Sequence, residues 1–153
     1  SAETAHTAES NSADSAVSPP TPQRTAKPVN LARLQGAARQ QAVLRLVAAC
    51  GLVPLADLSE IFFPDSAAYG RQFLKKLAND GLLQYVKLGK RLAYCLTVKG
   101  GKSLKGKRRY EPFVLPEERL WEHAAMTGSI AARLCVLATS RGASIDMQHE
   151  AAW

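Results

Sequence analysis

The residues of this sequence best suited to chemistry are its bases. Between Arg71 and Arg109 the chain carries twelve Lys or Arg residues against one acid, Asp80, whereas the rest holds eight bases and twelve acids. The positive charge is therefore local, on a chain of net charge +7. Each phosphate that a basic surface neutralises releases condensed counterions, so this segment predicts a nucleic-acid-binding surface. The alternative is a solvated lysine-rich face.

No catalytic or metal-binding pattern accompanies these bases. His6, His123 and His149 lie far apart, so the sequence lacks the histidine cluster that a DNA-nicking enzyme would combine with a tyrosine. It also lacks a GxxxxGK[ST] phosphate loop, a GxSxG elbow and a Cys or His spacing suited to zinc. We therefore expect a non-enzymatic protein with no cofactor and no metal.

The three cysteines, Cys50, Cys95 and Cys135, are widely spaced and have mostly apolar neighbours. They form no disulfide framework, and we expect buried thiols in a reducing cytoplasm, with one of them on the surface of a dimer helix as the alternative. The opening segment is too polar for a signal peptide, and no run reaches the ~18 apolar residues of a membrane span. The expected protein is cytoplasmic, with no membrane partner.

Residues 1–30 are almost entirely small or polar, and Val17 and Val29 are their only large aliphatic residues. Such a segment cannot bury enough apolar surface to offset the entropy of ordering it, so we expect a disordered N-terminal tail. Its four prolines make the end of the tail a stiff linker.

Two helices are expected next. The first runs from Leu31 to Ala49 with a weak break at Gly36, and Gly51 ends it. Pro54 is suited to the first position of a short second helix that ends at Phe63. The apolar face of the first helix is Val43, Leu46, Val47 and Cys50, and that of the second is Leu55, Leu58, Ile61 and Phe62.

A third helix is expected from a cap at Asp65 or Ser66 to about Asn79, with Gly81 closing it. Its periodicity gives it a core face and a polar face. Gly70 lies on the core face, where it would let the second helix approach closely. The core face is Gly70, Phe73, Leu74 and Leu77; the outward face is Ala68, Arg71, Gln72, Lys75 and Asn79, with Tyr69 and Lys76 at its edge.

A basic hairpin follows. The runs 82–88 and 92–97 contain good strand formers, and Gly89, Lys90 and Arg91 connect them. Thr97 can cap a short turn to Leu104. Three helices and a basic-tipped hairpin, in this order, predict a winged helix-turn-helix domain over residues 31–109, mainly α with a small β-hairpin.

The C-terminal region, residues 110–153, is expected to form one long helix from Pro116 or Glu117 to about Ser140, with Gly142 ending it. At ~1.5 Å per residue the helix would exceed what a small domain needs to cover itself, so it is a candidate dimerisation element. The alternative is that it packs back on the first helix. The expected contact seam is Leu120, Trp121, Ala124, Thr127, Ala131, Leu134, Cys135 and Ala138.

The run Leu74-Lys-Lys-Leu77, followed by Gly81-Leu82-Leu83, Tyr94-Cys-Leu96-Thr97 and Gly100, resembles the winged helix of bacterial replication-relaxation and plasmid mobilisation accessory proteins. The resemblance covers about residues 40–137, and His123 matches a histidine that this family carries near the start of the following helix. It implies double-stranded DNA binding near an origin of replication or transfer, or at a promoter, often as a homodimer. Relaxosome or replication proteins are the further partners that it implies.

We therefore expect the third helix to read a major groove through Arg71, Gln72 and Lys75, with Ala68 and Tyr69 near the base edges. A protein-interaction module within a larger nucleoprotein or secretion assembly is the alternative, and an RNA binder is a weaker one because few aromatic residues could stack on bases. The remaining candidate DNA contacts are Lys76, Asn79, Lys87, Lys90, Arg91, Lys107, Arg108 and Arg109. Sequence-independent attraction is the main role expected of Lys87, Lys99, Lys102, Lys105 and Lys107.

Overall fold

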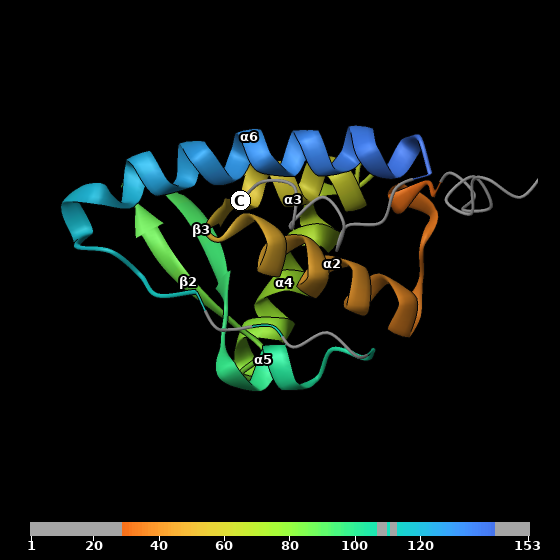
Figure 1. Ribbon diagram of the computed structural model, residues 1–153, viewed down its shortest axis with the longest axis horizontal. Helices are drawn as coiled ribbons and strands as arrows, with labels where there is room; N and C mark the ends of the chain where they lie inside the picture. Colours follow the sequence, from red (N-terminus) through yellow and green to blue (C-terminus); the bar gives the residue numbers. More distant parts are fainter. Residues whose placement is uncertain (1–28, 107–109, 111–112, 143–153) are drawn as a thin grey trace, which may run out of the picture.

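The computed structural model describes residues 29–106, 110 and 113–142. This part of the chain is mainly helical and has one small antiparallel sheet (Figure 1). The long helix α6, Trp121–Ser140, runs across the top of the view, above the sheet and helix α2, and the short helix α5, Val98–Lys102, lies at the opposite edge (Figure 1). The predicted class, mainly α with a small β element and a long C-terminal helix, is confirmed. Of the predicted tail, only Val29 and Asn30 fall within the described residues.

The first helix begins later than its pattern predicts. Helix α2 spans Gly36–Cys50, and Leu31–Arg33 form a separate 3₁₀ turn, η2. The side chain of Asn30 caps this turn by accepting a hydrogen bond from the Ala32 N–H at 3.1 Å, and Leu34 then adopts an extended conformation. The weak break predicted at Gly36 is instead a full interruption, because the helix begins at Gly36 and does not include Leu31–Arg33. The predicted C-terminal end at Gly51, which has a φ of 91°, is confirmed.

Pro54 is not the first residue of a helix, as the sequence suggested. It forms the two-residue strand β1, Val53–Pro54, and caps helix α3, Leu55–Phe62. Helix α4, Ala67–Asn79, follows after Phe63 and Pro64, and Ser66 is its N-cap. The sheet thus has three strands instead of the two expected.

Strands β2, Leu83–Leu88, and β3, Arg91–Leu96, pair in antiparallel fashion around the two-residue turn Gly89–Lys90, and Arg91 already belongs to β3. Strand β1 pairs with the other edge of β3, which gives the order β1-β3-β2. Thr97 caps α5 as predicted, because its Oγ1 accepts a hydrogen bond from the Gly100 N–H at 2.9 Å.

Side chains alternate across the sheet and divide the interior into two apolar clusters. The main core lies between the inner face of the sheet and the helices α2, α3 and α4, and it includes Leu44, Phe62, Leu74, Tyr94 and Leu96. The second core lies on the outer face of the sheet under the first half of α6, and it consists of Leu52, Val86, Leu88, Ala93, Cys95 and Ala125, with Phe113, Leu115, Trp121 and Ala124 packed around them.

Helix α6 packs back on α2 and β1, which was one of the two predicted arrangements. The predicted contact seam is confirmed in part: Cys135 is buried and Trp121 and Ala124 pack against the second core, whereas Leu120, Thr127 and Leu134 are exposed. A Cβ atom on Gly128 would lie 1.8 Å from the carbonyl oxygen of Leu52, so only glycine permits this close approach. The approach turns small side chains inward, and the buried residues of α6 are Ala125, Gly128, Ala132, Cys135 and Thr139.

Candidate nucleic-acid interface

The outer face of α4 is the polar surface that the sequence predicts. Ala68, Tyr69, Arg71, Gln72, Lys75, Lys76 and Asn79 are all exposed, whereas Gly70, Leu74 and Leu77 are buried. The Ser66 Oγ accepts a hydrogen bond from the Tyr69 N–H at 3.2 Å and thereby fixes the first turn. The structure therefore brings these seven candidate residues onto the exposed side of one helix.

An aromatic cluster at the end of α3 and on α4 holds the helix in place. Phe63 makes an edge contact with Tyr69, with ring centroids 5.4 Å apart, and a tilted contact with Phe73 at 5.1 Å. A Cβ atom on Gly70 would lie 3.0 Å from the Phe63 ring, so the predicted packing role of Gly70 is confirmed. Tyr69 is still 51% exposed, which leaves its outer edge available to a ligand.

Arg39 of α2 completes this cluster, although the sequence analysis did not single it out. Its guanidinium carbon lies 4.7 Å above the Phe63 ring, 5.6 Å from Tyr69 and 5.9 Å from Phe73. Its Nε also donates a hydrogen bond to the Leu34 carbonyl at 2.8 Å. This cation–π arrangement connects the start of α2 to the first half of α4.

The three basic residues of the hairpin lie in different surroundings. Lys87 on β2 and Lys90 in the turn are exposed. Arg91 has the same strand parity as Ala93 and Cys95, so its side chain belongs to the outer face of the sheet. There Nη2 of Arg91 lies 2.6 Å from Oε1 of Glu122 on α6, and both side chains remain largely exposed. An acid of the long helix thus partly neutralises one predicted contact residue.

A groove of about 820 Å³ runs between α3, the start of α4 and the tip of the hairpin. Arg71, Lys90 and Arg91 lie along it, and Glu60 is its only acidic lining residue among those described. Pro54, Leu55, Phe63, Pro64, Ala67 and Leu92 give the groove an apolar floor. A phosphate-bearing chain could therefore meet cations from both sides of the groove.

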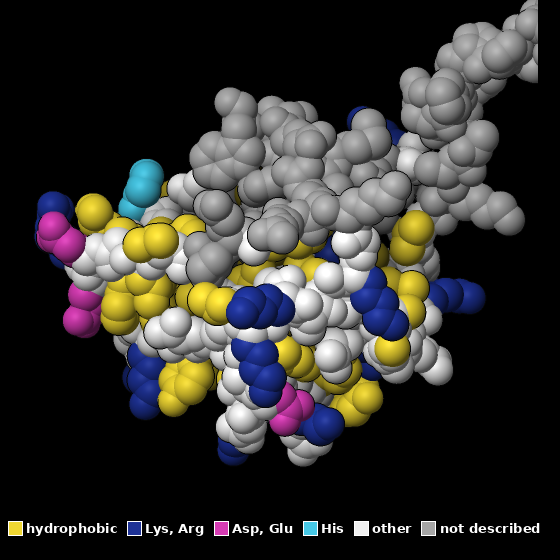
Figure 2. All heavy atoms as spheres, turned by 60° about the horizontal axis from the view of Figure 1, so that its bottom comes forward, with side chains coloured by type: hydrophobic (Ala, Val, Ile, Leu, Met, Phe, Trp, Pro, Cys, Tyr) yellow, Lys and Arg dark blue, Asp and Glu magenta, His cyan; other side chains and the backbone are white. Residues whose placement is uncertain are grey.

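The bases beyond the hairpin have mixed roles. Lys99 donates a hydrogen bond from Nζ to the Asp80 carbonyl at 2.8 Å, so it compensates the negative end of α4. Lys102 and Lys105 are exposed, and the Gln41 side chain fixes this segment through 3.0 Å hydrogen bonds to the Ser103 carbonyl and the Lys105 N–H. Figure 2 turns the α5 end forward and shows Lys and Arg side chains spread over it among hydrophobic ones. Lys107, Arg108 and Arg109 lie outside the described residues.

Within the described residues no three His, Cys, Asp or Glu side chains come together as a metal site could require. None of the described helices combines the length and the apolar character needed to cross a bilayer. The chain matched nothing in comparisons with protein-family models, curated proteins and solved structures.

Proposed function

We propose that this protein is a non-enzymatic winged helix-turn-helix protein that binds double-stranded DNA sequence-specifically, with α4 as its reading helix and the β2–β3 hairpin as its wing. The observation that carries the proposal is that α4 has two distinct faces. One face is buried in the core, and the other presents Arg71, Gln72 and Lys75 to solvent beside the groove that Arg71, Lys90 and Arg91 line. The order α2, β1, α3, α4, β2, β3 and the sheet order β1-β3-β2 support it.

Arg71 and Gln72 have the chemistry for base recognition. A guanidinium can donate to both major-groove acceptors of guanine, and an amide can pair with adenine, each with ~1 to 3 kcal/mol of discrimination. Lys90 at the turn and Lys87 on β2 would bind phosphates on the side of the wing. If about six phosphates are neutralised, the slope of log K against log salt is about −5.

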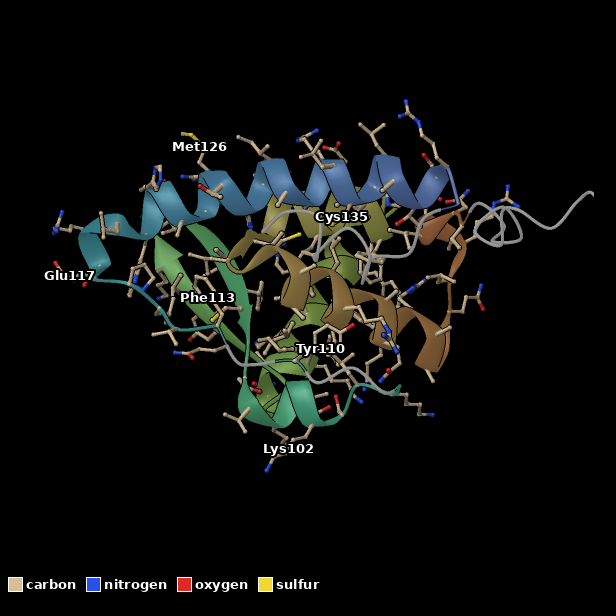
Figure 3. The ribbon with its side chains drawn as sticks, in the orientation of Figure 1. Lys102, Tyr110, Phe113, Glu117, Met126 and Cys135 are labelled. Atoms are coloured by element: carbon tan, nitrogen blue, oxygen red, sulfur yellow. The ribbon has the colours of Figure 1, made fainter. Side chains whose placement is uncertain are left out.

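The biological setting that accompanies this proposal is plasmid or mobile-element replication or transfer, or transcription regulation. A second copy of the chain is the partner we propose for α6. Met126, Ile130, Leu134 and Leu137 form a row on its outer side, each at least 50% exposed, and Figure 3 shows Met126 pointing away from the body of the molecule.

The two ends of this row carry opposite charges. Glu122, whose carboxylate also contacts Arg91 of its own chain, lies one turn before Met126, and Arg141 lies about one turn after Leu137. An antiparallel second copy would therefore place each Glu122 near an Arg141 of the other chain while it covers the apolar row.

The test is a binding titration against a random 30-base-pair duplex and its single strand at two salt concentrations. The variant combines Arg71→Ala, Gln72→Ala and Lys75→Ala, all on the exposed face of α4. A matched control, Arg33→Ala with Arg119→Ala, removes the same charge from exposed positions elsewhere. Salt-dependent duplex binding that only the α4 variant weakens supports the proposal. Absence of binding at low salt contradicts it, and a preference for the single strand favours an RNA-type ligand.

A protein-interaction module is the second candidate, and the apolar floor of the groove favours it. Pro54, Leu55 and Leu92 would suit the apolar side chains of a peptide better than a phosphate backbone. In that case the α4 triple variant would retain its protein partner, and replacing Leu55 with a charged residue would abolish the interaction.

A further inference from the structure

Two of the three cysteines, distant in sequence, meet where α2 and α6 pack. Cys50 is the last residue of α2 and Cys135 lies on the inward side of α6, and their Sγ atoms are 3.9 Å apart. Figure 3 shows Cys135 beneath α6, on the side that faces α2. The third cysteine, Cys95, is buried in the second core on the outer face of the sheet.

Tight packing maintains this juxtaposition on both sides of the pair. On one side, Gly128 of α6 lies against the carbonyl oxygen of Leu52, which is two residues after Cys50. Ala132, one turn before Cys135, is fully buried in the main core. The distance between the two sulfur atoms is therefore set by the close approach of α6 and not by a surface contact.

We propose that Cys50 and Cys135 are a redox modification site, in which a hydroperoxide converts the two thiols into a reversible intramolecular disulfide that locks α6 onto α2. A disulfide requires an S–S distance of about 2.05 Å. The sulfur atoms must close by about 2 Å, which small rotations about the two Cα–Cβ bonds can supply.

The chemistry balances in two steps. Cys50 is half-buried and Cys135 is 3% exposed, so the oxidant meets Cys50 first. The Cys50 sulfur attacks one peroxide oxygen, its proton passes to the departing oxygen, and Cys50 sulfenic acid and one water (or alcohol) result. The Cys135 sulfur then attacks the Cys50 sulfur, the sulfenic hydroxyl leaves with the Cys135 proton as water, and the disulfide forms. Two thiols lose two electrons in total, and the peroxide gains them.

The contact between the two thiols moves their pKa values in opposite directions. The hydrogen bond to Cys135 and burial raise the pKa of Cys50, so Cys50 meets the oxidant as a thiol and gives up its proton in the first step. The hydrogen bond from Cys50 lowers the pKa of Cys135, which favours the thiolate needed for the second step. Cys95 is fully buried, and this burial also raises its pKa to about 11, so an oxidant reaches Cys95 less readily than the partly exposed Cys50.

The experiment treats the folded full chain with equimolar hydroperoxide and measures intact mass, tryptic peptides and thermal midpoint. We expect a loss of about 2 Da, the mass of two hydrogen atoms, with no change in oligomeric size. Trypsin separates the cysteines into segments 46–71, 92–99 and 134–141, so a cross-link between the first and the last identifies the pair. The midpoint should rise by about 10 °C and return when dithiothreitol is added.

Cys95→Ala is the matched control, and it should form the cross-link as the unaltered chain does. Cys50→Ala and Cys135→Ala should each prevent it. Because Cys135 is buried and its replacement could unfold the protein, circular dichroism accompanies each variant, and Cys50→Ala at the half-exposed end of α2 gives the decisive result. A cross-link through Cys95, a cross-link between two chains, or oxidation of Cys50 to sulfinic acid without a cross-link would overturn the proposal.

Discussion

The guanidinium of Arg91, at the first position of β3, lies 2.6 Å from the carboxylate of Glu122 on α6. This contact connects the tip of the hairpin to a helix that begins 30 residues later in the chain. It also places a second acid, in addition to Glu60, beside the groove that Arg71, Lys90 and Arg91 line.

Glu122→Gln should therefore strengthen duplex binding. Without its carboxylate partner, Arg91 can contribute its full charge to the groove, and we expect about a threefold gain in affinity at low salt, because an exposed pair is worth less than ~1 kcal/mol. Glu118→Gln removes an equal charge from an exposed position nearby and is the control. Equal gains from both variants in a fluorescence-anisotropy titration would mean that net charge, and not the Arg91 contact, is responsible.

Lys90→Ala and Arg71→Ala should change DNA binding in two different ways. Lys90 is an exposed turn residue whose expected contact is a phosphate, so its loss should weaken binding to all duplexes and reduce the salt slope by about 1. Arg71→Ala should instead relax base preference at one position by ~1 to 3 kcal/mol. Selection of bound sequences from a random pool, with the salt slope measured for each variant, separates the two effects. Identical sequence preferences for Arg71→Ala and the unaltered protein would remove Arg71 from base recognition.

Gly128→Ala should destabilise the fold by about 3 kcal/mol or more, because the added Cβ would lie 1.8 Å from the Leu52 carbonyl oxygen. Either α6 must move away from β1 or the backbone at Leu52 must shift. The measurement is the urea midpoint. Ser129→Ala, at the neighbouring half-buried position, should change stability by no more than about 0.5 kcal/mol.

Arg39→Met should cost ~1 to 2 kcal/mol of stability, since it removes the guanidinium from three aromatic rings and from the Leu34 carbonyl while it retains an apolar stem. It should also loosen the first half of α4 and accelerate amide hydrogen exchange there. Arg33→Met, at an exposed position, is the control. Unchanged exchange in α4 would show that Arg39 does not hold the helix.

Leu134→Glu should produce a monomer if α6 pairs with a second copy. Leu134 is 50% exposed, so the substitution places a charge in the apolar row without disturbing the core. Sedimentation equilibrium of the variant and the unaltered chain measures the effect. Ala38→Glu, at an exposed position of α2, adds the same charge away from α6 and should leave the mass unchanged. A monomeric unaltered chain would contradict the dimer.

The elements that could be predicted are those with local signals. Ser66 and Thr97 are caps whose side chains accept hydrogen bonds from N–H groups three residues later, and the spacing of Gly70, Leu74 and Leu77 is set by the helix itself. The polar face of α4 could be identified for the same reason. A residue whose role depends on a single helix or turn can be recognised without knowing which other elements pack against it.

The features that the sequence did not reveal depend on distant contacts. Large side chains usually indicate the buried side of a helix, but on α6 the approach to Leu52 requires glycine and turns Ala125 and Ala132 inward. The two-residue strand at Val53 exists only because β3 pairs with it. The partner of Arg91 and the cation–π role of Arg39 likewise come from other helices.

Helix α6 follows every other described element in the chain, yet it covers the outer face of the sheet. A ribosome releases α2 through β3 first, so for part of synthesis Val86, Ala93 and Cys95 lack the cover that α6 gives them. A nascent chain halted before Trp121 would therefore expose an apolar sheet surface and be prone to associate with other chains. Formation of α6 therefore removes an apolar sheet surface from contact with other chains.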